Sequence, residues 1–301
     1  MCLGRFYMEY SMRLTAIALT TLALFSGQGV SKEKDVVQPY GLSKAGILRY
    51  QDVFHPVVGQ QGMVSSQNRI ATEVGVDILK QGGNAADAAV AVAFTLAVTL
   101  PRAGNLGGGG FMLYHSNEAS KTYAIDYRET APTGVTAEHF LTEDGKKDRY
   151  SAVSWDAAGV PGTVAGMYKS WQVFGSGKLS WQQLLAPAVK LAEQGFKVNY
   201  DLAQVLAVIK PYMTENDAAA SYFYKQDGSS YHQGDVLIQS DLAWSLKQIS
   251  EHGPDAFYKG EIADKIVADM EKHGGHIDKA DLANYQVKIK APVAGNYRGY
   301  S

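Results

Sequence analysis

One arginine in the sequence has the surroundings of an anion-binding residue. Arg128 lies in the segment DYRETAP (126–132), after a strand-like stretch at 122–127 and just ahead of a proline-marked turn. An arginine fixed at the end of a strand presents a planar guanidinium that can donate two parallel hydrogen bonds to one carboxylate. The alternative is a surface ion pair with Asp126 or Glu129, which contributes little to stability. If only this segment is considered, a surface ion pair is more common than a carboxylate-binding arginine.

Other catalytic and metal-binding patterns are weak or missing. The sequence contains no GxSxG, HExxH or GxxxxGK[ST] segment. His273, His276 and Asp278 lie close together and could hold a metal ion, but the glycines at 274–275 favour a solvated turn. The single cysteine, Cys2, excludes an internal disulfide and a thiol nucleophile within the fold. We therefore expect neither a metal ion nor a cofactor.

A glycine-rich stretch, GNLGGGGFML (104–113), lies between a predicted helix at 85–100 and a predicted strand at 111–115. Phosphate-binding loops have the opposite order, with a strand before the loop and a helix after it, so that the helix amides face the anion. The order here argues against a nucleotide site. We expect the glycines to permit a close backbone approach, under a substrate.

Composition and charge describe a folded protein. The 301 residues are 46% hydrophobic and 19% charged, and the net charge is −2. No dense run of lysine and arginine is present, so nucleic acid is excluded as a partner.

The N-terminal region has the layout of a secretory signal. A mostly apolar run at 14–25 follows Arg13 and precedes small and polar residues, which predicts a signal peptide at 12–30. Met12 could be the true start, with residues 1–11 not translated. Residues 31–61 read as a lead-in segment. We expect an exported protein, periplasmic or secreted. A membrane anchor is the alternative, although the run is shorter than the ~20 residues that span a bilayer.

The remaining chain divides into an α/β part at 62–130 and a mainly helical part at 155–285. Apolar periodicity, capping residues and glycine stops predict the helices. The helix at 85–100 is apolar on all sides, which is typical of a helix buried in a large core. The predicted helices are 68–81, 85–100, one from 159–163 through Trp171, 181–194, 240–252 and 261–273, and the predicted strands are 63–67, 111–115, 122–127 and 286–301.

Four motifs give the chain a family resemblance. QGGNAADAAVA (81–91), GNLGGGGFML (104–113), DYRETAP (126–132) and GVPGTVAGM (159–167) occur in the order seen in γ-glutamyltransferases, also called γ-glutamyltranspeptidases or glutathione hydrolases. The resemblance runs from about Gly62 to the last residue. It implies the αββα four-layer sandwich of N-terminal nucleophile hydrolases, of which this chain supplies one outer helical layer and part of the sheets.

The resemblance also assigns roles. It implies that Arg128 holds the α-carboxylate of the γ-glutamyl group of glutathione or another γ-glutamyl compound, and that water, an amino acid or a peptide accepts that group. The family's nucleophile is a threonine that self-cleavage exposes at the start of a small subunit, with its new α-amino group as general base. That threonine lies beyond the matched region. We therefore expect residues 62–301 to be a large-subunit region truncated before the small subunit, with no catalytic nucleophile and no activity alone.

Two alternatives remain from the sequence. Relatives with this scaffold cleave β-lactam side chains or poly-γ-glutamate, and lysine at position 128 would favour such an acylase, whereas the observed arginine favours a γ-glutamyl α-carboxylate. The other alternative is a non-catalytic, truncated protein that binds γ-glutamyl compounds through Arg128.

Overall fold

The computed structural model describes residues 56–147 and 154–300. The contacts divide the chain into a unit at 1–58 and a unit at 59–301, and the fold below is that of the second unit. The predicted signal peptide at 12–30 and most of the predicted lead-in lie outside the described residues. None of the described helices combines the length and the apolar character needed to cross a membrane.

The first two helices begin at asparagine caps, of which the sequence predicted Asn84. The Asn68 side chain accepts a hydrogen bond from the amide of Ile70 at the start of α2 (Arg69–Lys80). Asn84 and Asp87 form a reciprocal capping box at the start of α3 (Ala85–Thr99). The prediction that this apolar helix is buried is confirmed: Val90, Phe94 and Val98 are fully buried.

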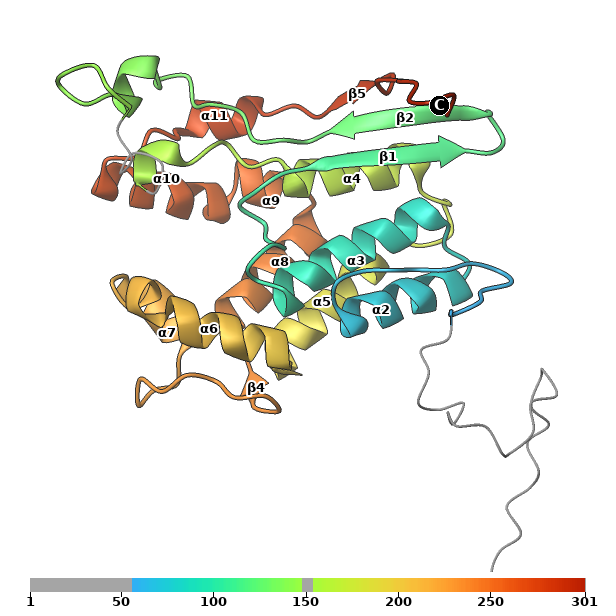
Figure 1. The fold of residues 1–301 in the computed structure, drawn as a ribbon, viewed down its shortest axis with the longest axis horizontal. Helices are drawn as coiled ribbons and strands as arrows, with labels where there is room; N and C mark the ends of the chain where they lie inside the picture. The colour runs from blue at the N-terminus through green and yellow to red at the C-terminus, as the bar shows by residue number, and fades with distance from the viewer. Residues whose placement is uncertain (1–55, 148–153, 301) are drawn as a thin grey trace, which may run out of the picture. The chain divides into compact units, whose positions relative to one another are not determined.

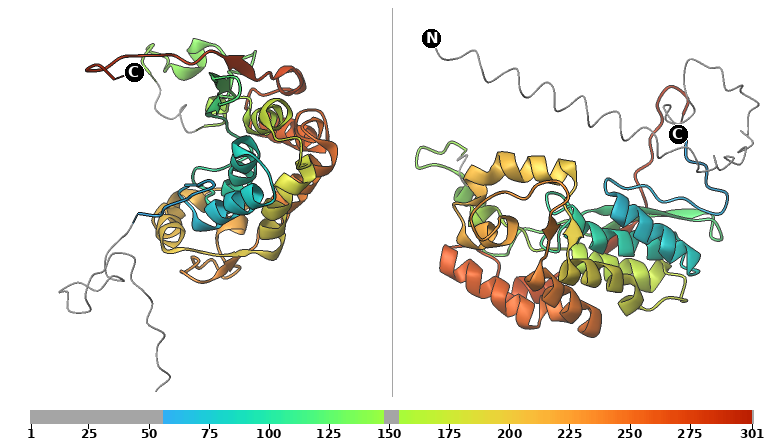
Figure 2. Two further views of the ribbon diagram at one scale, coloured as in Figure 1. Left: turned by 90° about the vertical axis from the view of Figure 1, so that its right-hand side faces the viewer. Right: turned by 90° about the horizontal axis from the view of Figure 1, so that it is seen from below.

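A three-stranded antiparallel sheet lies beside these helices (Figure 1). Its order is β1 (Phe111–Ser116), β2 (Lys121–Asp126), β5 (Lys288–Lys290), with β2 in the centre. The inner face packs on the helices through Ile125, which is fully buried, and through Tyr114 and Tyr123, whose rings lie 4.7 and 5.0 Å from the Phe174 ring. Seen from below in Figure 2, the helices lie in front of the strands.

The outer face of the sheet is open. Phe111 and Leu113 alternate with partly buried residues along β1 and have 64% and 70% of their surface exposed. Their cross-strand partners Asp126 and Ala124 share this face. In the described residues, helices cover one face of the three-stranded sheet, and its second face is uncovered.

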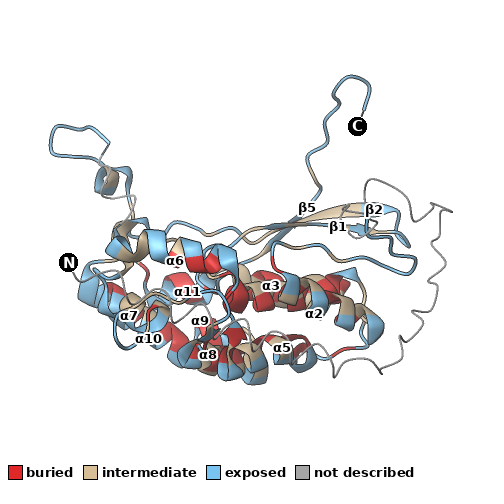
Figure 3. Ribbon diagram, turned by 60° about the horizontal axis from the view of Figure 1, so that its bottom comes forward, coloured by how far each residue is buried: buried red, intermediate tan, exposed pale blue. Residues whose placement is uncertain are grey.

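The second half of the unit is mainly helical, as predicted. Three helices have the predicted bounds, namely α5 (Trp181–Gln194), α8 (Ser240–His252) and α10 (Glu261–His273). Figure 3, coloured by burial, marks the buried residues within these helices. The remaining elements are the 3-10 helices η2 (Ala137–Phe140) and η4 (Trp155–Ala157), helices α4 (Thr163–Phe174), α6 (Tyr200–Met213), α7 (Asp217–Phe223), α9 (Asp255–Tyr258) and α11 (Lys279–Asn284), and the pair β3 (Phe196–Lys197) and β4 (Val236–Leu237).

Aromatic side chains of these helices fill the core. Trp181 is 3% exposed, donates its indole N–H to the carbonyl of Ile249 at 2.9 Å and packs edge-on against Phe94. Such a pair contributes packing energy beyond the area that it buries.

Two strand predictions are wrong or overextended. The segment 63–67 forms no strand in the described structure, and of 286–301 only Lys288–Lys290 is a strand. An extended segment becomes a strand only where a second backbone pairs with it. Within the described residues, β5 pairs with just three residues of β2, and 63–67 has no paired backbone.

Asp87 ties α3 to the end of α4. Its carboxylate is fully buried, and Oδ2 accepts hydrogen bonds from the amides of Asn84 (2.9 Å) and Ser176 (3.0 Å). Asp87→Ala leaves both amides without an acceptor, so we expect it to lower the free energy of unfolding by about 2–4 kcal/mol. Asp77→Ala, which removes an exposed carboxylate paired with Lys80, is the control and should change it by less than about 0.5 kcal/mol. If urea denaturation showed equal losses of unfolding free energy for Asp87→Ala and Asp77→Ala, the stabilising role of the two Asp87 hydrogen bonds would be contradicted.

Candidate functional site

Arg128 is the second residue after the central strand β2, and hydrogen bonds hold both its amide and its carbonyl. Its amide donates to Asp126 Oδ1 at 3.2 Å, and its carbonyl accepts from the Tyr285 hydroxyl at 2.8 Å. The other Asp126 oxygen accepts from Lys290 Nζ at 2.7 Å, on the neighbouring strand. Hydrogen bonds from Lys290 and then from the Arg128 amide hold the pKa of Asp126 below its ordinary value. Asp126 therefore binds the backbone of Arg128 as a carboxylate.

The guanidinium of Arg128 reaches the open side of the sheet. Nε donates to Glu129 Oε2 at 3.0 Å, while 60% of the side chain is exposed. Its central carbon lies 5.7 Å from the centre of the exposed Phe111 ring, within the range of a cation–π contact. Among the described residues, the two terminal nitrogens of Arg128 have no hydrogen-bond partner. The ion pair with Glu129 is thus present. It uses Nε and leaves the two terminal nitrogens of the guanidinium available to a carboxylate.

The glycine loop lies close to the backbone around Arg128 and bonds the start of α4. The Gly108 carbonyl accepts hydrogen bonds from the amides of Gly162 (2.8 Å) and Thr163 (2.9 Å) at the start of α4. A side chain at Gly109 would collide with the Tyr127 carbonyl and the Glu129 amide. The glycines do permit a close backbone approach, and the backbone that approaches is the chain's own segment 127–129. Their predicted place under a substrate stays a prediction.

A groove of about 700 Å³ runs beside this segment, between α3 and the start of β1. Among the described residues, no charged side chain lines it. Its walls are residues 61–65, the alanine-rich face of α3 from Ala85 to Leu96, and Phe111, Met112 and Tyr127. The groove is apolar, and the charge of the site comes from the 126–129 segment next to it.

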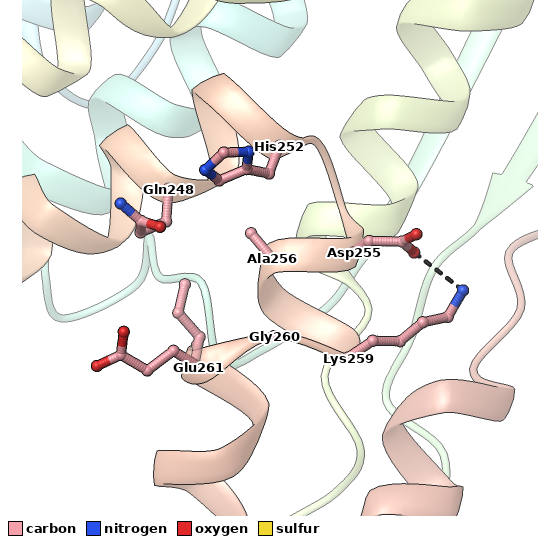
Figure 4. Close-up of a pocket in the computed structure, with 8 residues that line it drawn as sticks. Gln248, His252, Asp255, Ala256, Lys259, Gly260 and Glu261 are labelled. Carbon is pink, nitrogen blue, oxygen red and sulfur yellow. Dashed lines mark ion pairs between the residues drawn. The ribbon is translucent and has the colours of Figure 1, made fainter.

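A smaller hollow, of about 310 Å³, lies elsewhere, between the end of α8 and the start of α10 (Figure 4). Its charged groups include the exposed pair Asp255–Lys259, at 3.0 Å, with His252 and Glu261 at its rim. It shares no lining residue with the surroundings of Arg128. An exposed pair of this kind, one helical turn apart, is typical of a helix surface and carries no specific chemistry.

The three residues considered for a metal site face different partners. His273 stacks on Trp155 with ring centres 4.6 Å apart, and His276 Nε2 lies 2.8 Å from Asp156 Oδ1. Asp278 caps α11 through the amide of Asp281. Gly274 adopts the left-handed conformation that ends α10, in agreement with the predicted turn. Within 56–147 and 154–300, no group of histidine, cysteine and carboxylate side chains could hold a metal ion.

Tyr285 and Lys290 are the residues of this site that the sequence did not reveal. They are 157 and 164 residues away from their partners Arg128 and Asp126. No periodicity or motif connects positions so far apart. The only local signal was the strand-like alternation after 286, which predicted a strand there but not the strand that it pairs with.

Solved structures share this fold. The γ-glutamyltranspeptidase of Helicobacter pylori is 41% identical with a TM-score of 0.78, over 81% of this chain and 70% of that one. The enzyme from Pseudomonas nitroreducens complexed with L-DON is 41% identical with a TM-score of 0.73, over 80% of this chain and 70% of that one. A cephalosporin acylase from Bacillus halodurans is 27% identical with a TM-score of 0.65, over 84% and 48%. The predicted fold class, an α/β fold that forms part of the αββα sandwich of N-terminal nucleophile hydrolases, is confirmed.

Sequence relatives narrow the class to a family. The glutathione hydrolase proenzyme of Escherichia coli is 49% identical over 251 residues, which cover 83% of this chain and 43% of that protein. The proenzyme of Bacillus subtilis is 40% identical, over 81% of this chain and 41% of that protein. A family model described as gamma-glutamyltranspeptidase matches residues 71–301. The chain belongs to the γ-glutamyltranspeptidase family. It spans less than half the length of these two curated relatives.

Proposed function

We propose that this protein is the substrate-carboxylate-binding portion of an enzyme that hydrolyses or transfers the γ-glutamyl group of glutathione and related compounds. One observation carries the proposal. Arg128, in the family's DYRETAP motif, is held through its backbone at the end of a central strand while its guanidinium fork is open to solvent. A fork of this kind binds a carboxylate by two parallel, charge-assisted hydrogen bonds.

The chemistry follows the family's mechanism. A threonine hydroxyl of the small subunit attacks the γ-carbonyl, and the threonine's own α-amino group takes the hydroxyl proton. The amide C–N bond then breaks, the departing amine takes that proton, and an acyl-enzyme forms. Backbone amides stabilise the oxyanion, a strong electrostatic contribution. Water then completes hydrolysis, or an amino acid or peptide accepts the group. In this scheme Arg128 binds and orients the donor and takes no part in proton transfer.

The partner of this chain is the small subunit of the same precursor. The relatives from Escherichia coli and Bacillus subtilis are named proenzymes. The open sheet face with Phe111 and Leu113 is the face on which the second sheet of the sandwich stacks, about 10 Å away. The groove beside β1 adds apolar surface next to it. Burial of this surface stabilises the assembled protein.

The γ-glutamyl proposal is preferred to an acylase. The two γ-glutamyltranspeptidase structures are 41% identical to the chain and the cephalosporin acylase 27%. The direct test is release of p-nitroaniline from γ-glutamyl-p-nitroanilide by this chain co-expressed with a small subunit of the family, in parallel with a β-lactam side-chain substrate. Release from the β-lactam substrate alone would favour the acylase.

We also propose that the protein is exported. The apolar run at 14–25, with small and polar residues after it, motivates this proposal. Mass spectrometry of the protein from the cell that produces it should find a mature N-terminus near residues 27–32, in the periplasmic or secreted fraction. A cytoplasmic protein that retains Met1 would contradict export.

A further inference from the structure

The carbonyl of Arg128 receives a hydrogen bond from a distant part of the chain. Tyr285, at the end of α11, donates its hydroxyl to this carbonyl at 2.8 Å. Burial raises the pKa of Tyr285 to about 12, and the nearby carboxylates of Asp126 and Glu129 add to the shift. The hydroxyl is therefore protonated at neutral pH and can donate.

The Tyr285 ring is itself fixed in place. It stacks on the ring of Tyr258, with centres 5.7 Å apart and planes at 8°. Tyr258 is 6% exposed, donates to the carbonyl of Pro161 at 2.8 Å and accepts from the amide of Ala165 at 3.2 Å. A side chain at Gly162 would collide with the Tyr285 hydroxyl, so the glycine leaves the space through which this hydroxyl reaches Arg128. The position of the Tyr285 ring is therefore fixed by contacts with α9 and with the start of α4.

The two backbone bonds of Arg128 act together. Asp126 holds the amide and Tyr285 holds the carbonyl, so the direction of the bond from Cα to Cβ is set from both sides. The guanidinium lies at the end of a long side chain, and a small rotation of the backbone moves it by more than a hydrogen bond tolerates. The bond from Tyr285 therefore controls where the guanidinium fork can point.

We propose that Tyr285 is a positioning residue for Arg128, an inference that rests on the proposed binding of the substrate α-carboxylate by Arg128. Tyr285 does not touch the substrate in this scheme. It raises affinity for the donor by holding the Arg128 backbone in the binding geometry before the substrate arrives, which lowers the entropic cost of binding.

The test is a double-mutant cycle of Tyr285→Phe and Arg128→Ala in the chain co-expressed with its small subunit, measured by hydrolysis of a γ-glutamyl anilide. Tyr285→Phe keeps the stacked ring and removes one hydrogen bond. We expect it to raise KM about three- to tenfold with kcat unchanged. In the Arg128→Ala background the same change should have no further effect, because the guanidinium that it positions is gone.

Tyr224→Phe is the matched control. Tyr224 is also a buried tyrosine, 4% exposed, and its hydroxyl donates to the carbonyl of Leu206 at 2.7 Å, a contact that has no part in the support of Arg128. We expect a lower melting temperature and an unchanged KM. In the assembled protein, hydrogen exchange at the amides of 128–130 should be faster in Tyr285→Phe and unchanged in Tyr224→Phe.

The outcomes separate the inference from the proposed function. A wild-type KM in Tyr285→Phe, beside a raised KM in Arg128→Ala, would overturn the positioning role alone. An equal loss of kcat/KM in both backgrounds would also overturn it, because Tyr285 would then act independently of Arg128. Wild-type kinetics in Arg128→Ala would overturn the proposed function, and the inference with it.

Discussion

Replacing Arg128 by alanine is expected to raise the KM for γ-glutamyl donors about ten- to a hundredfold in the assembled enzyme, because a charge-assisted pair with a carboxylate contributes roughly 1.5–3 kcal/mol. Self-cleavage of the precursor should remain, since Arg128 is 60% exposed and supports no core contact. Steady-state kinetics with a γ-glutamyl anilide, and the appearance of two subunits on a denaturing gel, measure both effects.

Arg128→Lys should recover only part of the affinity. Lysine keeps the charge but presents a point ammonium in place of the two-point fork. Arg69→Ala is the matched control, because Arg69 is also an exposed arginine paired with one carboxylate, that of Glu73. It should leave KM unchanged. Unaltered kinetics in Arg128→Ala would return Arg128 to a surface ion pair with Glu129.

The second large effect concerns the polypeptide of these 301 residues expressed by itself. We expect it to release no product from a γ-glutamyl anilide, because the resemblance places the threonine nucleophile and its amine base in the small subunit. Co-expression with a small subunit of the family that begins at threonine should restore turnover. Without that partner, the exposed Phe111 and Leu113 and the unpaired edges of β1 and β5 favour association, so poor solubility is also expected.

Turnover by the isolated chain, abolished by Arg128→Ala, would overturn this prediction and require a nucleophile among these residues. A matched co-expression, with the small subunit's first threonine replaced by alanine, controls for trace activity of the host. It should be inactive even when the two polypeptides copurify.

Local signals predicted six of the described α-helices and missed α6, α7, α9 and α11. Asn84 marked a helix start, and Gly195, Gly253 and Gly274 marked helix ends, because capping depends on residues within one turn of the end. The strands were predicted less well. The alternation at 63–67 and across 286–301 shows only that a segment could pair, and the pairing partner is a property of the whole fold.

The residues of the candidate site likewise fall into those that local sequence predicted and those that it did not. A motif of seven residues identified Arg128, and its neighbour Glu129 was foreseen as an ion-pair partner. The backbone supports came from Tyr285 and, through Asp126, from Lys290, which approach only because the last described segment returns beside the central strand. Contacts over such distances follow from topology and leave no trace in local spacing.

The most direct test of the central claim compares two donors that differ by one carboxylate. The assembled enzyme is given γ-glutamyl-p-nitroanilide and 4-aminobutyryl-p-nitroanilide, which lacks the α-carboxylate, and kcat/KM is measured for wild type and for Arg128→Ala. If Arg128 binds this carboxylate, wild type prefers the γ-glutamyl donor and Arg128→Ala loses about ten- to a hundredfold of that preference. An Arg128→Ala enzyme that keeps the full wild-type preference would contradict the claim.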